Sequence, residues 1–284
     1  MEKWAGCTAV VTGASSGIGA AIARKFVENG INVVALARRL ELLEELSKEL
    51  STDTTKLYPV RCDVTDEQQI LDVLAWVESE VGPISILVNN AGVFNGSTNL
   101  SDGDTQIWKQ TIYTNCIALC IFTREVIKSM KANGIDGLII HISSIAGRYV
   151  PDVPGEHYRV NIYPATKHAV TALNDSLRYE LRHEKSKIRV TSISPGITIT
   201  DIFRDHPAED MKSYGNMPYM HPNDIADAAM YILSTPPNVQ QFYGFQGLGK
   251  SYPTQLLKSS RVGGVCLCIV DTNTNSIGIR DVSN

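Results

Sequence analysis

The chain lacks an apolar run long enough to cross a membrane, and it lacks any concentration of positive charge. A membrane-spanning helix needs about 20 consecutive apolar residues, and no run in this sequence approaches that length. The formal net charge is -4, and the lysines and arginines are scattered, which excludes the basic surface that nucleic acids and anionic membranes require. The apolar stretch that follows Glu2 and Lys3 is too short for the core of a signal peptide. We therefore expect a cytoplasmic protein that acts on small molecules, without a nucleic acid partner and without a membrane span.

The 6 cysteines are too scattered for a small secreted disulfide scaffold. Cys266 and Cys268 alternate along an expected strand, so their side chains would face the same side. No second pair of cysteines or histidines at ligand spacing accompanies them. The sequence therefore predicts no metal site.

Short apolar runs alternate with amphipathic segments along most of the chain. With 43% hydrophobic content in 284 residues, the chain can build one large core. We expect strands over residues 7–11, 32–37, 56–61, 84–89, 138–142 and 189–193, and helices over residues 20–27, 40–50, 67–81, 105–131 and 163–183. Continuous apolar strands that alternate with helices are typical of a parallel sheet covered on both faces. The sequence predicts a single-domain α/β fold, a doubly wound parallel sheet of the Rossmann type.

A glycine-rich turn, Thr-Gly-Ala-Ser-Ser-Gly-Ile-Gly over residues 12–19, follows the first expected strand and opens the first helix. Glycines let the backbone turn tightly and approach a pyrophosphate, whose charge the free N–H groups of the helix end attract. The alternative is a tight turn without a ligand, but the preceding strand and the repeated strand–helix units favour a dinucleotide site. The candidate cofactor-binding residues of this turn are Gly13, Ser15, Ser16, Gly17, Ile18 and Gly19.

Tyr163 and Lys167 stand four positions apart at the start of a helix. This spacing places them on one helix face, where an ammonium group stabilises the ionised phenol and lowers its pKa from about 10. Such a phenol can give or take a proton at a carbonyl oxygen. The same spacing also occurs on exposed helix faces without a function. Here the pair follows a turn that carries Ser143 and Ser144 after the fifth expected strand.

Together these motifs resemble those of the short-chain dehydrogenase/reductase family, over residues 6–238. That family has a glycine-rich turn, an Asn-Asn-Ala-Gly segment, a catalytic serine and Tyr-x-x-x-Lys in this order, and the second of these reads Asn89-Asn90-Ala91-Gly92 here. The resemblance implies an oxidoreductase that transfers a hydride between a nicotinamide cofactor and an alcohol or carbonyl carbon.

The resemblance assigns roles to the reacting residues. Tyr163 would be the acid/base, Lys167 its partner, and Ser144 the hydroxyl that holds the substrate oxygen, with Ser143 as a structural neighbour. Asn115 would bend a helix and hold a water in a proton relay that reaches Lys167; the alternative is an asparagine that the helix tolerates. The cofactor contacts implied beyond the glycine turn are Asp63, Val64, Asn90, Ala91, Gly92, Tyr163, Lys167, Pro195, Gly196 and Thr200.

Two arginines follow the second expected strand, where an acidic residue would bind the ribose of an unphosphorylated cofactor. Arg38 and Arg39 stand there instead. Guanidinium groups pair with a 2'-phosphate, so the sequence predicts NADP(H), with Arg38 favoured because it directly follows the strand. The alternative is a pair of solvated arginines at the start of the next helix.

The substrate and the end of the chain are less clearly marked. Residues 163–173 and 232–236 and the loop with Pro151, Pro154 and Gly155 resemble a subgroup that includes insect farnesol dehydrogenases and a vertebrate steroid and carbonyl reductase. This likeness implies a hydrophobic secondary or allylic alcohol, such as a terpenoid or a steroid, and its carbonyl partner. We expect a catalytic domain over residues 1–240 and an atypical tail over residues 241–284, where the family's ending is not found.

Two questions stay open at this level. The first concerns the tail: residues 265–270 would form a strand in place of the family's last one, or the tail would leave the edge of the sheet uncovered. A homo-oligomer is possible, but one built on the family's last strand would depend on which of these two endings forms. The alternative function is an NADP(H)-binding sensor or scaffold without turnover, which the presence of all four reacting positions argues against.

Overall fold

The structure is a computed structural model that describes residues 2–151, 160–204, 219–236, 239–243, 267–271 and 276–280. Pro154 and Gly155 of the expected substrate loop, and most of the tail, lie outside these residues. In the part of the chain that is described, no helix combines the length and the apolar character of a membrane span.

Six parallel strands form the central sheet in the order β3-β2-β1-β4-β5-β6. Their bounds are β1 Thr8–Thr12, β2 Asn32–Ala37, β3 Leu57–Arg61, β4 Ile84–Asn89, β5 Leu138–Ile142 and β6 Arg189–Ile193. The strand order reverses between β1 and β4, which is where doubly wound sheets bind their ligands. Pro59, which has no N–H to donate, lies in β3 at the edge of the sheet. The predicted fold class and all six predicted strands are confirmed.

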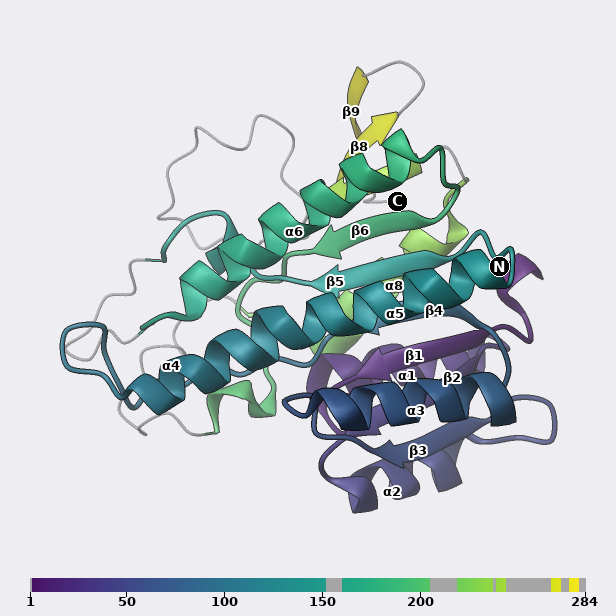
Figure 1. Ribbon diagram of the computed structural model, residues 1–284, viewed down its shortest axis with the longest axis horizontal. Coiled ribbons are helices and arrows are strands. Elements are labelled where there is room, and N and C mark those ends of the chain that lie inside the picture. Colours follow the sequence, from purple (N-terminus) through teal and green to yellow (C-terminus); the bar gives the residue numbers. More distant parts are fainter. Residues whose placement is uncertain are drawn as a thin grey trace.

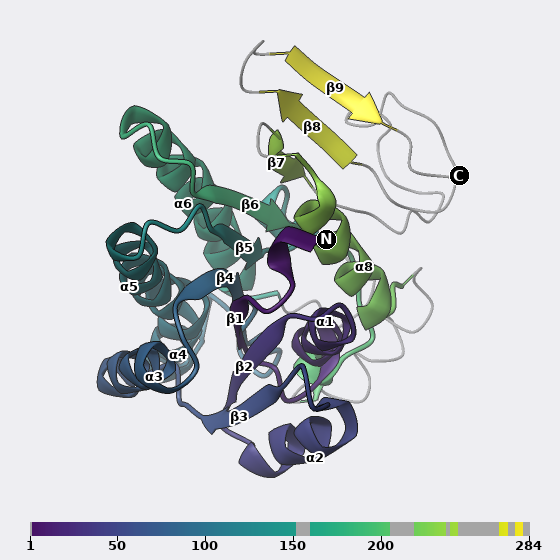
Figure 2. The ribbon, with the colours of Figure 1, turned by 90° about the vertical axis from the view of Figure 1, so that its right-hand side faces the viewer.

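Helices cover both faces of the sheet (Figure 1 and Figure 2). The helices α1 Gly17–Glu28, α2 Leu40–Leu50 and α8 Pro222–Ser234 lie on one face, and α3 Glu67–Glu80, α4 Thr105–Ile112, α5 Ala118–Ala132 and α6 Tyr163–His183 lie on the other. The described part of the chain also contains the short 3-10 turns η1 Glu2–Trp4, η3 Ile145–Gly147 and η4 Asp201–Phe203. The five predicted helices are confirmed, but the long one is interrupted by a π-helical turn, η2 Tyr113–Ile117.

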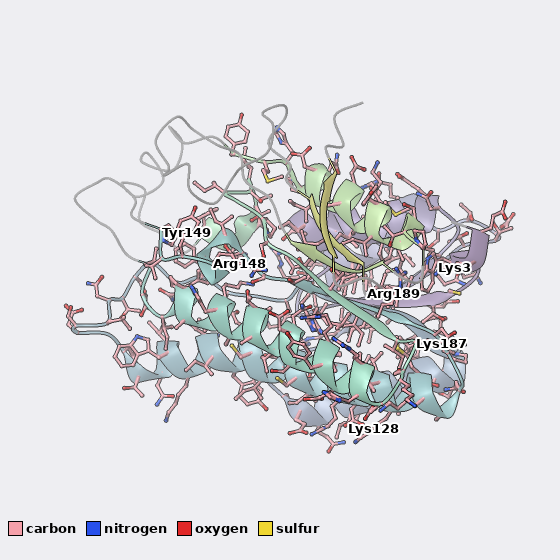
Figure 3. All side chains as sticks on the ribbon, turned by 90° about the horizontal axis from the view of Figure 1, so that it is seen from above. Lys3, Lys128, Arg148, Tyr149, Lys187 and Arg189 are labelled. Carbon is pink, nitrogen blue, oxygen red and sulfur yellow. The ribbon has the colours of Figure 1, made fainter. Side chains whose placement is uncertain are left out.

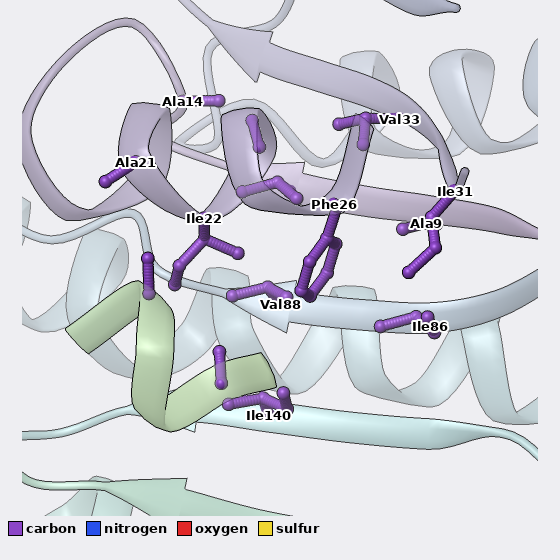
Figure 4. Close-up of a cluster of buried hydrophobic side chains, with 14 of the residues drawn as sticks. Ala9, Ala14, Ala21, Ile22, Phe26, Ile31, Val33, Ile86, Val88 and Ile140 are labelled. Carbon is purple, nitrogen blue, oxygen red and sulfur yellow. The ribbon is translucent and has the colours of Figure 1, made fainter. Parts of the chain in front are cut away.

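The strands divide their side chains between two cores because successive residues of a strand point to opposite faces. Ala9 and Val11 of β1 pack in the cluster under α1 and α8, whereas Val10 packs in the cluster under α3, α5 and α6. Figure 4 shows Ile22 and Phe26 of α1 lying on the first of these clusters, against residues of β1, β2, β4 and β5. All strand positions of β1, β4, β5 and β6 are buried, so these strands are rigid supports for the residues that follow them.

The chain segments after the carboxyl ends of the strands gather at one end of the sheet. Figure 3 shows Arg148 and Tyr149, which follow β5, at the end opposite to Lys187 and Arg189 at the start of β6. The glycine turn after β1, the Asn-Asn-Ala-Gly segment after β4 and the serines after β5 therefore share this end. This common edge is where the candidate site is built.

Three further strands form a separate antiparallel sheet in the order β7-β8-β9. They are β7 Val239–Tyr243, β8 Leu267–Asp271 and β9 Ser276–Arg280, and β7 lies beside β6 (Figure 2). A strand thus occurs close to the predicted residues 265–270, but it pairs with β7 and β9 in the small sheet.

Candidate active site

The glycine turn after β1 has the shape of a cradle for an anionic ligand. Gly13 and Gly17 have φ angles of +66° and +59°, a region that favours glycine. A Cβ atom at Gly19 would lie 2.4 Å from the carbonyl oxygen of Gly13, so a side chain there would collide with the turn. The first backbone N–H groups of a helix have no partner within the helix, so those at the start of α1 are suited to bind the charge of a pyrophosphate. The residues of the turn fit a dinucleotide.

The Asn-Asn-Ala-Gly segment is bonded directly to this turn. Asn90 Nδ2 donates to the carbonyl oxygens of Thr12 and Gly13 at 2.9 and 3.1 Å. In return, Thr12 Oγ1 accepts from the backbone N–H groups of Asn90 and Ala91, both at 3.0 Å. The ends of β1 and β4 are thereby held together at the point where the strand order reverses. Thr12 has a positioning role that the sequence pattern did not single out.

Arg39 lies across the glycine turn. Its Nη2 donates to Ser16 Oγ at 2.7 Å and to Ser15 Oγ at 3.1 Å, and its Nη1 donates to Asp201 Oδ2 at 3.1 Å. The hydrogen bond from Arg39 is the main reason that the pKa of Asp201 lies below its usual value. Arg38 is exposed and borders the same cavity. The sequence favoured Arg38 for cofactor recognition, but it is Arg39 whose guanidinium group lies beside the two serines.

Asp63 and Val64 follow β3 at the far side of the same cavity. Asp63 Oδ1 accepts from the backbone N–H and the hydroxyl of Thr65, at 2.9 and 2.8 Å. These bonds fix the turn after β3 and leave the apolar side chain of Val64 at the cavity wall. The position fits the flat, largely apolar surface of an adenine.

Lys167 lies beneath Tyr163 in a desolvated position. Its Nζ donates to the carbonyl oxygen of Ile142 at 2.9 Å and lies 5.7 Å from the centre of the Tyr163 ring. Burial lowers the pKa of Lys167 to about 8, because the charged form loses its hydration. An ammonium group so placed stabilises a phenolate more strongly than it would in water, since the local dielectric constant is low.

Asn115 lies in the π-helical turn η2 between α4 and α5, and its side chain is buried. Its Oδ1 accepts from the N–H of Val93 at 2.8 Å, and its Nδ2 donates to the carbonyl oxygen of Val93 and to Thr166 Oγ1, both at 3.0 Å. Thr166 Oγ1 in turn donates to the carbonyl oxygen of Tyr163 at 2.7 Å. Asn115 therefore joins the segment after β4 to the first turn of α6, and π-helical turns often mark such functional positions.

Ser144 follows β5 and faces the cavity. Its Oγ accepts from the N–H of Ala146 at 3.1 Å, so it caps η3 and its orientation is fixed. Ser143 Oγ instead donates to the carbonyl oxygen of Lys167 at 3.2 Å. Both serines border the cavity, but the Ser143 hydroxyl binds the backbone of α6, whereas the Ser144 hydroxyl caps η3.

The segment after β6 closes the remaining side. The carbonyl oxygen of Pro195 accepts from the N–H of Ile145 at 2.9 Å, and Thr200 Oγ1 caps η4 by accepting from Ile202 at 3.4 Å. A Cβ atom at Gly17 would lie 2.8 Å from Thr200 Cγ2, so the segment touches the glycine turn. Pro195, Gly196 and Thr200 all line the cavity.

One continuous cavity of about 560 Å³ joins these elements. At one end it is bordered by Ser15, Arg39 and Asp63, and at the other by Ser144 and Tyr163. Around Tyr163 the lining includes the apolar residues Val93, Phe94, Ile107, Ile145, Ala146, Pro151, Val160, Ile197, Ile202 and Phe203, together with the polar residues Asn95, Gln110, Thr111, Thr114 and Thr198. All the candidate residues named from the sequence, apart from the buried Asn115 and Gly19, line this cavity. It has the shape for a dinucleotide beside an apolar substrate.

Comparison with known proteins places this arrangement in a family. The family model described as short chain dehydrogenase matches residues 7–210. Farnesol dehydrogenase from Aedes aegypti is 43% identical over 241 residues, which are 84% of this chain and 95% of that protein. Dehydrogenase/reductase SDR family member 11 from Homo sapiens is 42% identical over 247 residues, 84% of this chain and 93% of that one.

Solved structures with similar folds also include dehydrogenases. The closed form of serine dehydrogenase complexed with NADP+ superposes with a TM-score of 0.73 at 31% identity, covering 90% of this chain and 99% of that one. Serine dehydrogenase from Escherichia coli superposes with a TM-score of 0.68 at 32% identity, covering 83% and 95%. The fold, the matched sequence and the order of the motifs lead to one conclusion: the chain belongs to the short-chain dehydrogenase/reductase family and is an oxidoreductase that acts on CH–OH donors.

Proposed function

We propose that the protein interconverts a hydrophobic alcohol and its carbonyl compound with NADP(H), and that residues 1–240 carry this activity. The observation that supports this most directly is the buried Lys167 beneath Tyr163, at the junction of the glycine-turn half and the apolar half of one cavity. The cofactor would be held by the glycine turn, by Asp63 and Val64, by the segment Asn90–Gly92 and by Pro195, Gly196 and Thr200. When bound, it supplies the hydride acceptor for oxidation and the hydride donor for reduction.

In this proposal the protein's own residues handle the proton and the substrate oxygen. In oxidation, ionised Tyr163 takes the proton of the alcohol hydroxyl; in reduction, the phenol returns it to the carbonyl oxygen. The Ser144 hydroxyl donates a hydrogen bond to that oxygen and stabilises the charge that develops there. The charge of Lys167 favours the phenolate, and Asn115 holds the first turn of α6 in place through Thr166.

The preference for the phosphorylated cofactor rests on charge. The two residues that directly follow β2 are Arg38 and Arg39 rather than a carboxylate, and both border the cavity. The Asp201 carboxylate, from the segment after β6, pairs with Arg39. Arg39 lies beside Ser15 and Ser16, so a 2'-phosphate at this place would meet a guanidinium group and two hydroxyls. The solved relative with NADP+ bound supports the same cofactor. We propose Arg39 as the main recognition residue and Arg38 as a second one.

The substrate proposal rests on the apolar lining and on the relatives. Ten apolar side chains line the substrate half and would contact a hydrocarbon chain or ring system, while Tyr163 and Ser144 would bind its oxygen. One of the similar proteins is named for farnesol, a terpenoid alcohol. Terpenoid or steroid-like alcohols are therefore the proposed class.

Two measurements test this function. The first compares the dissociation constants of NADPH and NADH by fluorescence, for wild type and for Arg39→Ala; we expect wild type to prefer NADPH, and the variant to lose about tenfold to a hundredfold in NADPH affinity with little change for NADH. The second compares turnover of farnesol by wild type and by Tyr163→Phe. The variant should lose about a hundredfold or more in kcat while still binding the cofactor. A protein that binds NADPH but turns over no alcohol would instead be a sensor.

A further inference from the structure

The phenyl ring of Phe94 lies against the ring of Tyr163. Their centres are 4.6 Å apart and their planes are tilted by 34°, which is the close end of the range for aromatic pairs. Phe94 comes from the segment after β4, two residues beyond Gly92, and Tyr163 from the start of α6. The proposed acid/base therefore has one side covered by a neighbouring ring.

A third ring extends this cover. Phe203, at the end of η4, meets the ring of Phe94 edge-on, with centres 5.9 Å apart and planes at 75°. Both phenylalanines line the substrate half of the cavity. We name Phe94 and Phe203 together the aromatic wall. It is built from two segments that lie more than a hundred residues apart in the sequence and meet only in the fold.

The backbone next to Phe94 is fixed by hydrogen bonds to a buried side chain. Its neighbour Val93 is bound at both backbone groups by the side chain of Asn115, at 2.8 and 3.0 Å. The Phe94 side chain is only 8% exposed although it belongs to a loop. To swing away from Tyr163, the ring would give up its contacts with both aromatic neighbours. The wall is therefore a fixed boundary for the substrate.

This boundary limits what the reacting carbon can carry. The substrate oxygen must lie within hydrogen-bond reach of the Tyr163 phenol, and the reacting carbon is directly bonded to that oxygen. The Phe94 ring contacts the Tyr163 ring and also borders the cavity, so a group on that carbon that points towards Phe94 would meet the ring, where a hydrogen fits more easily than another carbon. The other substituent extends along the aliphatic lining formed by residues such as Ile145, Val160 and Ile197.

We propose that Phe94, supported by Phe203, is the specificity-determining residue that makes the enzyme prefer primary alcohols and aldehydes to secondary alcohols and ketones. This inference rests on the proposed function, and it narrows the substrate class to alcohols with a single large substituent on the reacting carbon, such as farnesol, so that steroid alcohols with the hydroxyl on a ring carbon are disfavoured.

The test compares two alcohols that differ by one methyl group: farnesol, which is primary, and its analogue with an added methyl group on the carbinol carbon. The quantity measured is the ratio of kcat/KM for the two, in wild type, Phe94→Ala, Phe94→Leu and Phe203→Ala. NADPH affinity of each variant, measured by fluorescence, reports separately that the cofactor half of the site is folded. Phe94→Leu serves as the matched control, because leucine keeps most of the volume of the wall.

Wild type should prefer farnesol by about 10- to 200-fold, the range that one excluded carbon gives in an apolar pocket. Phe94→Ala should reduce the ratio about tenfold or more, mainly by raising kcat/KM for the secondary alcohol. Phe203→Ala should shift it in the same direction by less, and Phe94→Leu should keep most of it. A wild type that oxidises both alcohols equally, or a ratio that Phe94→Ala does not change, would overturn this inference and leave the proposed function intact. If wild type binds NADPH and oxidises neither alcohol, the proposed function fails first and this inference fails with it.

Discussion

Trp108 Nε1 donates a hydrogen bond of 2.9 Å to Asn161 Oδ1, which joins α4 to the residue two positions before Tyr163. Asn161 has a φ angle of +49°, a left-handed conformation that costs free energy in a residue other than glycine, although asparagine tolerates it best. Backbone strain of this kind persists where the surrounding structure holds it, often beside functional residues. The hydrogen bond from the Trp108 indole helps to stabilise this conformation of Asn161, and so helps to position the Tyr163 phenol.

We expect Trp108→Phe to lower both stability and turnover. Loss of one hydrogen bond should reduce the free energy of unfolding by about 1 kcal/mol, measured by chemical denaturation. A looser start of α6 should lower kcat about tenfold, because small displacements of a reacting group are costly, while the dissociation constant for NADPH stays the same. Trp76→Phe on α3, far from α6, is the control. Equal kcat in Trp108→Phe and wild type would show that Asn161 holds its conformation without the indole.

Asp201→Asn should tighten the binding of NADPH. The carboxylate of Asp201 now pairs with Arg39 and would also repel a nearby 2'-phosphate. Asparagine keeps the shape but removes the charge, so about a twofold to tenfold gain in NADPH affinity is expected for this half-exposed pair. NADH, which lacks the phosphate, serves as the comparison in the same fluorescence titration. Weaker NADPH binding in the variant would mean that Asp201 is needed to orient Arg39.

The buried Lys167 should make stability rise with pH in the alkaline range. Its pKa is about 8 in the folded protein against an ordinary value of 10.5. Between these values the unfolded chain binds a proton that the folded chain does not, so the free energy of unfolding of wild type increases with pH. Lys167→Met lacks this contribution. Across this window the difference between the two proteins should change by on the order of 3 kcal/mol, measured by denaturation at several pH values. Parallel pH curves would contradict the lowered pKa.

His141 should make the protein sensitive to acid. It lies in β5, fully enclosed, with its Nδ1 3.2 Å from Asn89 Nδ2, and burial lowers its pKa from 6.5 to about 3. A folded-state pKa below the unfolded value means that stability is complete above pH 6.5 and is lost as the pH falls. His141→Leu should remove this loss, which amounts to on the order of 2 kcal/mol between pH 6.5 and about pH 5. In the variant, Asn89 keeps its bond to Thr123 at 3.0 Å. An unchanged acid midpoint would mean that another group governs acid unfolding.

The sequence predicted the sheet well because each strand and helix is marked locally. The apolar runs that became β1, β4, β5 and β6 are buried along their whole length, and burial on both faces removes the alternation that would mark an exposed strand. The family resemblance implied a bend in the helix at Asn115, but the sequence did not predict that this bend is a π-helical turn. The small sheet of β7, β8 and β9 depends on pairing between segments far apart, which local patterns do not report.

Local sequence was enough to predict relationships that span a single turn, namely the glycine turn of residues 13–19 and the placement of Tyr163 and Lys167 on one helix face. Their geometry follows from backbone conformation and from the helical repeat, which act over a few residues. Two other relationships became visible only in the folded protein: Arg39 rather than Arg38 lies beside Ser15 and Ser16, and Phe94 covers Tyr163. These contacts join side chains that come from different loops. They depend on how the sheet brings the loops together and on which rotamers fit there. The spacing of residues along the chain does not report either of these.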